Sequence, residues 1–303
     1  MIKGLAITPP ILGRISIGMM VEQDGKRRPQ KNDQFTITTQ IQTKEGWRLH
    51  PLDEQLRKQQ SGKLRSIPIR LPFNDPDLNL RVQYSFFDSQ TARPLCVGNG
   101  EQCKRQTPNG LESLPCPSPG ECTFAQNHCK PYARLNVIIG DDDPLGTFMF
   151  RTTGFNSIRT LAARLQYFSA MSGNRLAYLP LMLKLRGKST RQSYGQPIYY
   201  VDITLRDDLS LEETLRSAKD LEAERFNAGF NQKGLDDQAR IGFANGAFED
   251  SEEDTPAIVE EFYPAPESPT QTAPSRQSPT SLNEKLNQKA QAFQAPTRPI
   301  QIS

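Results

Sequence analysis

The cysteines of this chain are the residues whose type and spacing most clearly indicate chemistry. All five fall within one window of the 303-residue chain, as Cys96, Cys103, Cys116, Cys122 and Cys129. Thiolates carried by short loops rich in Gly and Pro can converge tetrahedrally on a zinc ion. The spacing lacks the paired C-x2-C knuckles of common zinc motifs, so unliganded thiols, redox chemistry and disulfides stay as alternatives.

The four predicted ligands of one structural zinc ion bound the segment that has no regular pattern. They are Cys103, Cys116, Cys122 and Cys129. Cys96 ends a predicted strand and is either a small buried residue or the replacement for Cys103, because the glycines of CVGNG could wrap a bound thiolate. His128 is a weaker candidate, since adjacent residues rarely bind the same ion. A site closed by four cysteines leaves no open position, which argues against catalysis by the metal.

Residues for enzymatic catalysis are sparse. The two histidines, His50 and His128, belong to no nucleophile-elbow motif, and the sequence has no Walker loop or dinucleotide fingerprint. The run Asp141–Asp143 invites a nuclease reading, but three acids before Pro144 are better explained by a solvated hairpin turn. We therefore expect a protein without enzymatic activity and without a small-molecule substrate, and a metal-dependent hydrolase is the enzyme alternative.

Basic residues gather at predicted loops and beside the cysteines. Such groups can pair with nucleic-acid phosphates without reading bases, and they can equally be ordinary hairpin tips. The candidate contacts with nucleic acid or a partner are Lys26, Arg27, Arg28, Lys104, Arg105, Arg186, Lys188 and Arg191. From Ala247 onward there are nine acidic and four basic residues, which give a net charge of −5. Because the whole chain has a net charge of +3, the residues before Ala247 carry +8. This split is compatible with DNA as a partner.

Regular elements must position these residues, and the patterns predict an α+β fold. We expect a mainly antiparallel sheet with one or two packed helices, an inserted cysteine-rich metal-binding loop and a disordered C-terminal tail. The predicted strands cover 13–21 and 33–43 around a basic turn, 64–72 and 80–88 as a second pair, and 132–139, 147–153, 178–188 and 196–206.

Helical spacing predicts two helices in the second half of the chain. Over 154–173 one apolar face is formed by Ile158, Leu161, Ala162, Leu165 and Phe168. Asn156 or Ser157 should cap its start, and Gly173 suits the left-handed position after its end. Ser210 with Glu213 is a capping box that begins the second helix, which should fray near Gly229 or Gly234.

The chain therefore divides into four parts. They are a β-rich part over 1–95, a zinc-binding insertion over 96–130, an α+β part over 131–246 that completes the core domain, and an acidic, Pro-rich, disordered tail over 247–303. Within the tail, a short helix over 281–293 presents an apolar stripe that could bind a partner. The stripe consists of Leu282, Leu286 and Phe293.

The first residues do not form a secretory signal in our reading. Their apolar stretch is broken by Pro9, Pro10 and Arg14, and no cleavage pattern follows. No run of apolar residues is long enough to span a membrane. We expect a cytoplasmic protein, in which clustered cysteines are more often metal ligands than disulfides.

Several segments resemble one protein family. LCVGNGEQCKR, LPCPSPGEC, HCKPYARLNV and GTFMFRTTGFNSIRTLAARLQYFSAMSGNRLAYLPLMLKLR are similar, in this order, to segments of the recombination-directionality-factor-like proteins of phages and integrative elements. The resemblance covers roughly 5–207, and the helix entry and LAYLPLMLKLR are its most specific parts.

This resemblance implies a non-enzymatic accessory factor of a mobile genetic element. Such proteins bind a large serine integrase, chiefly through its coiled-coil region, and favour excision over integration by preferring one conformer of the recombinase. Relatives are often described only as metal-binding proteins. Some serve other roles, so a DNA-binding accessory protein for phage or plasmid replication or recombination is the alternative function.

Overall fold

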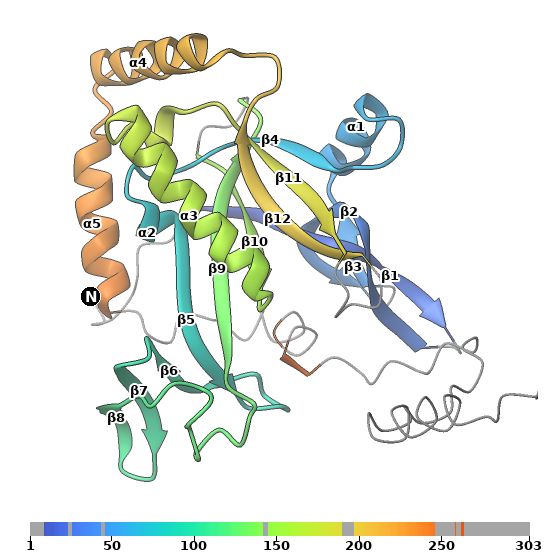
Figure 1. Cartoon of the computed structure of the whole chain (residues 1–303), viewed down its shortest axis with the longest axis vertical. Coiled ribbons are helices and arrows are strands. Elements are labelled where there is room, and N and C mark those ends of the chain that lie inside the picture. The colour runs from blue at the N-terminus through green and yellow to red at the C-terminus, as the bar shows by residue number, and fades with distance from the viewer. Residues whose placement is uncertain are drawn as a thin grey trace, which may run out of the picture. The chain divides into compact units, whose positions relative to one another are not determined.

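A computed structural model gives the architecture of the chain (Figure 1). It describes residues 9–23, 26–43, 46–141, 145–189, 197–245, 258, 262 and 263, and of these 19–23, 26–31, 244 and 245 by their backbone alone. Within these ranges the fold is α+β, as the sequence predicts, with a large and mostly antiparallel sheet. No helix of the described residues combines the length and apolarity that crossing a bilayer needs.

Nine strands form the main path of the sheet, in the order β3-β2-β1-β10-β9-β5-β6-β7-β8 for the described residues. Three more, β4, β11 and β12, join it where β4 pairs with β9. Among the strands of the described residues, only the neighbours β1 and β10 run parallel. The strands are β1 (Ile11–Gln23), β2 (Lys26–Thr43), β3 (Gly46–Leu49), β4 (Ser66–Arg70), β5 (Leu80–Phe87), β6 (Pro94–Gly98), β7 (Gln102–Thr107), β8 (Gly110–Pro115), β9 (Lys130–Ile139), β10 (Thr147–Thr152), β11 (Leu181–Lys188) and β12 (Ile198–Leu205).

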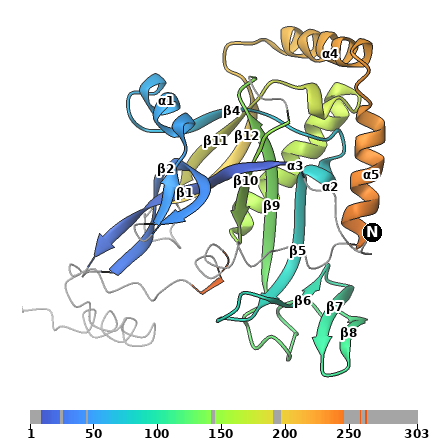
Figure 2. The ribbon, with the colours of Figure 1, turned by 180° about the vertical axis from the view of Figure 1, so that it is seen from behind.

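The main hydrophobic core lies on one side of β9 and β10. Because side chains alternate across a strand, Ala133, Leu135 and Val137 face this core, and Phe148 and Phe150 of the neighbouring β10 face it as well. Helix α3 (Phe155–Ser172) packs on the same core and covers it in the view of Figure 1. Figure 2 shows the sheet from the other side, where β5 and β9 lie in front of α3.

Helix α3 confirms the predicted helix and most of its predicted features. Ile158, Leu161, Leu165 and Phe168 are buried, which is the face that the spacing predicts. Gly173 follows its end with a φ of 65° in the left-handed region, where glycine is favoured. The predicted N-cap is wrong: the cap residue is Gly154, which makes no side-chain cap hydrogen bond, and both Asn156 and Ser157 lie inside the helix.

The described residues hold five α-helices, more than the one or two that the sequence predicts. The other four are α1 (Pro51–Gln59), α2 (Pro76–Asn79), α4 (Leu211–Asn227) and α5 (Gln232–Asn245). In α4 the predicted capping box is present, with both hydrogen bonds between Ser210 and Glu213. A new helix, α5, begins where fraying is predicted: the chain turns after Gly229 (φ 85°), and Gly234 lies within the helix.

The predicted pair formed by 64–72 and 80–88 is wrong. The intervening residues do not make a hairpin turn, since Asp75 caps the short helix α2 and directs the chain elsewhere. As a result β4 pairs with β11 and with the far end of β9, whereas β5 pairs with β6 and with the beginning of β9. Each of the two strands therefore has β9 as a partner that is distant in the sequence.

Two predicted loops are strands instead. Lys26, Arg27 and Arg28 belong to β2, which pairs with β1 through this basic stretch, so it is a continuation of the hairpin rather than its turn. The cysteine window is likewise not a plain loop, because it contains the meander of β6, β7 and β8. Short strands with Gly–Asn turns carry too few alternating apolar residues to be recognised by periodicity. The predicted helix over 281–293 lies outside the described residues.

Candidate metal centre

The cysteines lie in a module that extends from the sheet beyond the end of β5 (Figures 1 and 2). We define the cysteine module as residues 94–129, which comprise the β6–β8 meander and the segment that returns to β9. Two cysteines are on adjacent strands of the meander, one directly follows it and two are on the return segment. In this order they are Cys96, Cys103, Cys116, Cys122 and Cys129.

Gly98 allows two of these cysteines to approach closely. It lies opposite Cys103 in the pairing of β6 with β7, and the N–H of Cys116 donates to the carbonyl of Glu101 at 2.8 Å. A Cβ atom at Gly98 would lie 2.7 Å from Cβ of Cys103 and 3.1 Å from Sγ of Cys116. A contact under 3.0 Å is closer than real Cβ atoms show. A larger residue at this position would therefore push the two cysteines apart.

The thiols of Cys96 and Cys129 are both affected by burial and by neighbouring cysteines. Burial, followed by the charges of the four other cysteines, raises the pKa of Cys129 to about 12. Burial also raises the pKa of Cys96 to about 11, against the lowering effect of a hydrogen bond with Arg105. Because each thiolate disfavours the others, several of them can be ionised together at neutral pH only with a cation among them.

The five cysteines lie in one module, but their side chains are not arranged around a common point. In the part of the chain that the structure describes, no three Cys, His, Asp or Glu side chains are arranged so that they could hold a metal ion. All five cysteines are free thiols, and Cys96 and Cys103 are buried while the other three are half-buried. The donor types fit zinc, and the half-buried return segment would have to bring its ligands closer to the meander.

Arg105 is directed into the cysteine module. Its guanidinium carbon lies 4.2 Å from the centroid of the Phe124 ring. Burial lowers the pKa of Arg105, but the hydrogen bond with Cys96 and the charges of Cys96, Cys103 and Cys122 together raise it. Arg105 therefore makes contacts within the cysteine module. Lys104 alternates with it on β7 and faces the opposite side of the meander.

His128 packs among aromatic rings. Its ring stacks on Phe86 with centroids 6.3 Å apart and lies 5.8 Å from the ring of Tyr263. Phe86 in turn meets Phe124 edge-on at 5.7 Å. These rings give His128 a packing role beside Cys129.

The predicted basic contacts in the second half of the chain have partners within the protein. Arg186 forms an ion pair with the buried Asp202 at 2.8 Å. Lys188 donates to Oδ1 of Asn156 at 2.8 Å and lies above the ring of Tyr200. Arg191 and the side chains of Lys26, Arg27 and Arg28 fall outside the described residues. Arg186 and Lys188 lie two residues apart on β11 and therefore share one face of that strand.

The candidate catalytic residues have structural contacts. Asp141 forms ion pairs with Arg70 at 2.6 Å and Arg206 at 3.0 Å. Burial raises the pKa of Asp141, but hydrogen bonds from Arg206 and Arg70 lower it below its usual value. His50 caps α1, since its Nδ1 accepts from the N–H of Leu52 at 3.2 Å. Asp142 and Asp143 lie outside the described residues.

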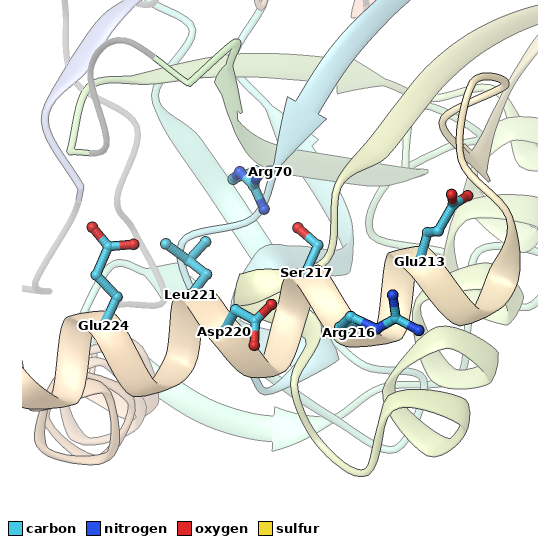
Figure 3. A pocket seen from close by; sticks show the side chains of 7 residues that line it. All are labelled: Arg70, Glu213, Arg216, Ser217, Asp220, Leu221 and Glu224. Carbon is cyan, nitrogen blue, oxygen red and sulfur yellow. The ribbon is translucent and has the colours of Figure 1, made fainter.

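An open hollow of about 420 Å³ lies between Arg70 and one face of α4 (Figure 3). Its lining alternates in charge and contains neither histidine nor cysteine. The lining residues are Arg70, Glu213, Arg216, Ser217, Asp220, Leu221 and Glu224. Arg70 at its wall is already engaged by Asp141 and by the carbonyl of Tyr178.

Two features of this region are not predicted from the sequence. One is the aromatic packing around the cysteines, which only the pairing of β5 with β9 brings together. The other is the packing of Ile258, Phe262 and Tyr263 on Phe87 and Tyr132. The signal for the second is the pair Phe262–Tyr263, which interrupts a segment otherwise rich in acid and proline.

Comparison with known proteins identifies a family but no individual relative. The comparisons found no match among curated proteins and none among solved structures. A family model described as Gp3-like, recombination directionality factor-like, matches residues 12–206, which include the sheet from β1 to β12, the cysteine module and α3. The match spans more than half of the chain, and the chain therefore belongs to the recombination directionality factor-like family.

Proposed function

We propose that this protein is a non-enzymatic recombination directionality factor that binds a large serine integrase and favours excision. The observation that carries the proposal is the family match, because residues 12–206 include most of the body and the whole cysteine module. In this mechanism the integrase supplies the strand chemistry, and the factor acts by binding one of its conformers more tightly than the other.

The residues considered for catalysis are engaged in structural contacts, and this supports a binding role for the protein. His50 is used to cap a helix, and Asp141 is neutralised by two arginines, which leaves it poorly placed to hold a metal ion. The DNA-binding alternative receives little support from the predicted basic residues, since Arg105, Arg186 and Lys188 have partners within the protein.

The test is recombination in a purified system. The full-length protein is mixed with the integrase of the same mobile element and with either the excisive or the integrative pair of attachment sites. We expect excision to be stimulated, integration to be suppressed and the two proteins to co-elute. Unchanged recombination in both directions, together with separate elution, would contradict the proposal.

We further propose that the cysteine module holds one structural zinc ion. The ligands would be Cys116, Cys122 and Cys129 with Cys103, and Cys96 is the alternative for Cys103. Zinc bound by thiolates would remove their mutual repulsion and tie the return segment to the meander. The support is the close approach of Cys103 and Cys116 at Gly98, together with the electrostatic effect of the other four cysteines on Cys129, in a module that has few buried apolar residues.

Metal analysis of the purified full-length protein tests this proposal. We expect about one zinc per chain, and Cys116→Ser or Cys122→Ser should remove it. Cys96→Ser should retain more zinc than Cys103→Ser if Cys103 is the ligand, and the reverse order would assign Cys96 instead. Protein that carries no zinc when purified without chelators and refuses added zinc would overturn the proposal.

A further inference from the structure

The last residues that the structure describes pack on the body through three apolar side chains. They are Ile258, Phe262 and Tyr263, and we call them the anchor. Ile258 and Phe262 are almost completely buried, with exposed fractions of 0 % and 3 %. Both have helical backbone and are four residues apart, which is the spacing that places two side chains on one face of a helix. The anchor therefore presents one face to the body.

The surface beneath the anchor comes from the end of β5, the residues after it and the start of β9. We define the seat as Phe87, Ala92 and Tyr132, which form one buried apolar cluster with the anchor, separate from the main core. The ring centroid of Phe262 lies 4.7 Å from that of Phe87 and 5.2 Å from that of Tyr132, and both pairs meet edge-on. Departure of the anchor would expose this aromatic surface to water.

Two hydrogen bonds orient the anchor on the seat. Nζ of Lys130 donates to the carbonyl of Phe262 at 2.7 Å and lies 5.7 Å from the centroid of its ring. The hydroxyl of Tyr263 donates to the carbonyl of Phe87. Apolar side chains at a helical spacing are the means by which many proteins recognise a short peptide. The contacts of the seat therefore suit one pattern, an aliphatic residue followed four and five residues later by aromatic residues.

The anchor is an intramolecular ligand joined to the body by residues 246–257, which follow the last residue of α5. Such a tether gives a segment an effective concentration on the order of millimolar without adding a contact. The anchor itself buries few side chains, and burial of apolar area is the main source of its affinity. An external segment that makes the same contacts can therefore compete with it.

The seat and the anchor differ in their relation to the family match. The seat and Lys130 lie within the matched residues 12–206, whereas the anchor lies outside them. The anchor also reaches the cysteine module, because the ring of Tyr263 lies 5.8 Å from that of His128. A segment that occupies the seat thus contacts the matched part of the chain where the body meets the cysteine module.

We propose that the seat is a binding site for a segment of a partner protein, and that the anchor occupies this site in cis until the partner segment displaces it. The partner segment has the chemistry of the anchor, with one aliphatic residue and two aromatic residues at the same spacing. The anchor is then an intramolecular competitor that lowers the apparent affinity of the seat. This inference does not depend on the integrase role.

The test uses the full-length protein and a labelled synthetic peptide of residues 254–266, which carries the anchor pattern. The anchor is removed from the seat by Ile258→Ala with Phe262→Ala, and we call this variant the vacated protein. In an anisotropy titration the vacated protein should bind the peptide at least about tenfold more tightly than the wild type, whose own anchor competes. Equal affinity of the two proteins, or no binding to either, would overturn the proposal.

Two matched variants in the vacated background separate the seat from general charge. Lys130→Met removes the donor to the peptide carbonyl and should weaken peptide binding. Lys219→Met removes the same charge from an exposed position on α4 and should leave the affinity unchanged. An equal loss in both variants would show that the acidic peptide is held by net charge alone and would contradict the proposal. A peptide with Phe262→Ala should bind neither protein.

Hydrogen exchange of the wild-type protein provides a measurement that needs no variant of the chain. An excess of the unlabelled peptide should accelerate the exchange of amides in residues 258–263 of the protein, and the peptide with Phe262→Ala should not. Unchanged exchange at saturating peptide would overturn the proposal. Sedimentation tests the other occupant: a wild-type dimer that the vacated protein does not form would assign the seat to a second copy of this chain and would also overturn it.

Discussion

The body of the protein and the cysteine module are held together by different means. The body has a large core in which residues such as Ile69, Leu135 and Phe150 are almost completely buried. In the described part of the cysteine module the buried apolar side chains are Cys96, Val97, Cys103 and Ala125, and none of them belongs to the main core cluster. A sheet continues through both regions, but apolar burial stabilises only one of them.

It follows that backbone pairing does not by itself make a stable module. A short meander without a large apolar face is marginal in water, and sulfur replaces hydrocarbon at its centre here. The body should therefore respond to the loss of methylene groups, and the module should respond to changes around the thiols.

The largest effect is expected from Leu135→Ala in β9. Leu135 is fully buried, so the substitution should lower the free energy of unfolding by about 2–5 kcal/mol, through lost burial and the cavity left behind. Urea denaturation measures this loss. The matched substitution Leu111→Ala, on β8 of the module at a position 51 % exposed, should change it by less than about 0.5 kcal/mol. Equal losses would remove the distinction between the regions.

A smaller and local effect is expected from Gly98→Ala. The new Cβ would contact Cys103 and the carbonyl of Gln102, and such overpacking costs about 1–3 kcal/mol. Protease cleavage within the module should become faster and zinc uptake should weaken, with little change in the body. Gly120→Ala is the control, because nothing lies within 4 Å of a Cβ there. Identical behaviour of the two variants would show that the close approach at Gly98 has no energetic role.

Ser210→Ala should have a moderate effect confined to α4. Removing the capping box leaves an N–H without a partner and costs about 1 kcal/mol. Thermal unfolding of the body reports the loss. Ser210→Asn retains a capping acceptor and should restore most of the stability, so a variant with Asn as unstable as the variant with Ala would contradict the capping account.

The smallest effect is a pH dependence from His50. Burial lowers the pKa of His50 below the ordinary value of 6.5, so the unfolded chain binds a proton more readily than the folded one. The free energy of unfolding should therefore fall as the pH falls through 6.5, and it should level off below the folded pKa. Unfolding curves of the wild type and His50→Asn, which keeps a cap acceptor, isolate this contribution. Parallel pH profiles would contradict it.

The sequence predicts the parts of the fold whose signals are local. The spacing of Ile158, Leu161 and Leu165 and the capping box at Ser210 are such signals, and both are confirmed. The pairing of β4 and β5 with β9 is not predictable in this way, since long-range partners are chosen by the burial of the whole sheet face.

In the candidate site too, local features can be predicted from the sequence and long-range contacts cannot. The clustering of the cysteines is visible in the sequence, whereas the close approach of Cys103 and Cys116 at Gly98 depends on the pairing of β6 with β7. Arg81, Arg134 and Arg151 come from three separate strands, and only the sheet order makes them neighbours, which the sequence does not reveal. That the thiols bind zinc, and which of them do so, remains a prediction for metal analysis.

Hydrogen exchange of the full-length protein, with and without a strong zinc chelator, tests the difference between the two regions most directly. Removal of zinc should accelerate the exchange of amides in residues 94–129, while β9, β10 and α3 keep the protection that their packed core provides. Unchanged exchange in the cysteine module, or equal acceleration throughout the body, would contradict the account.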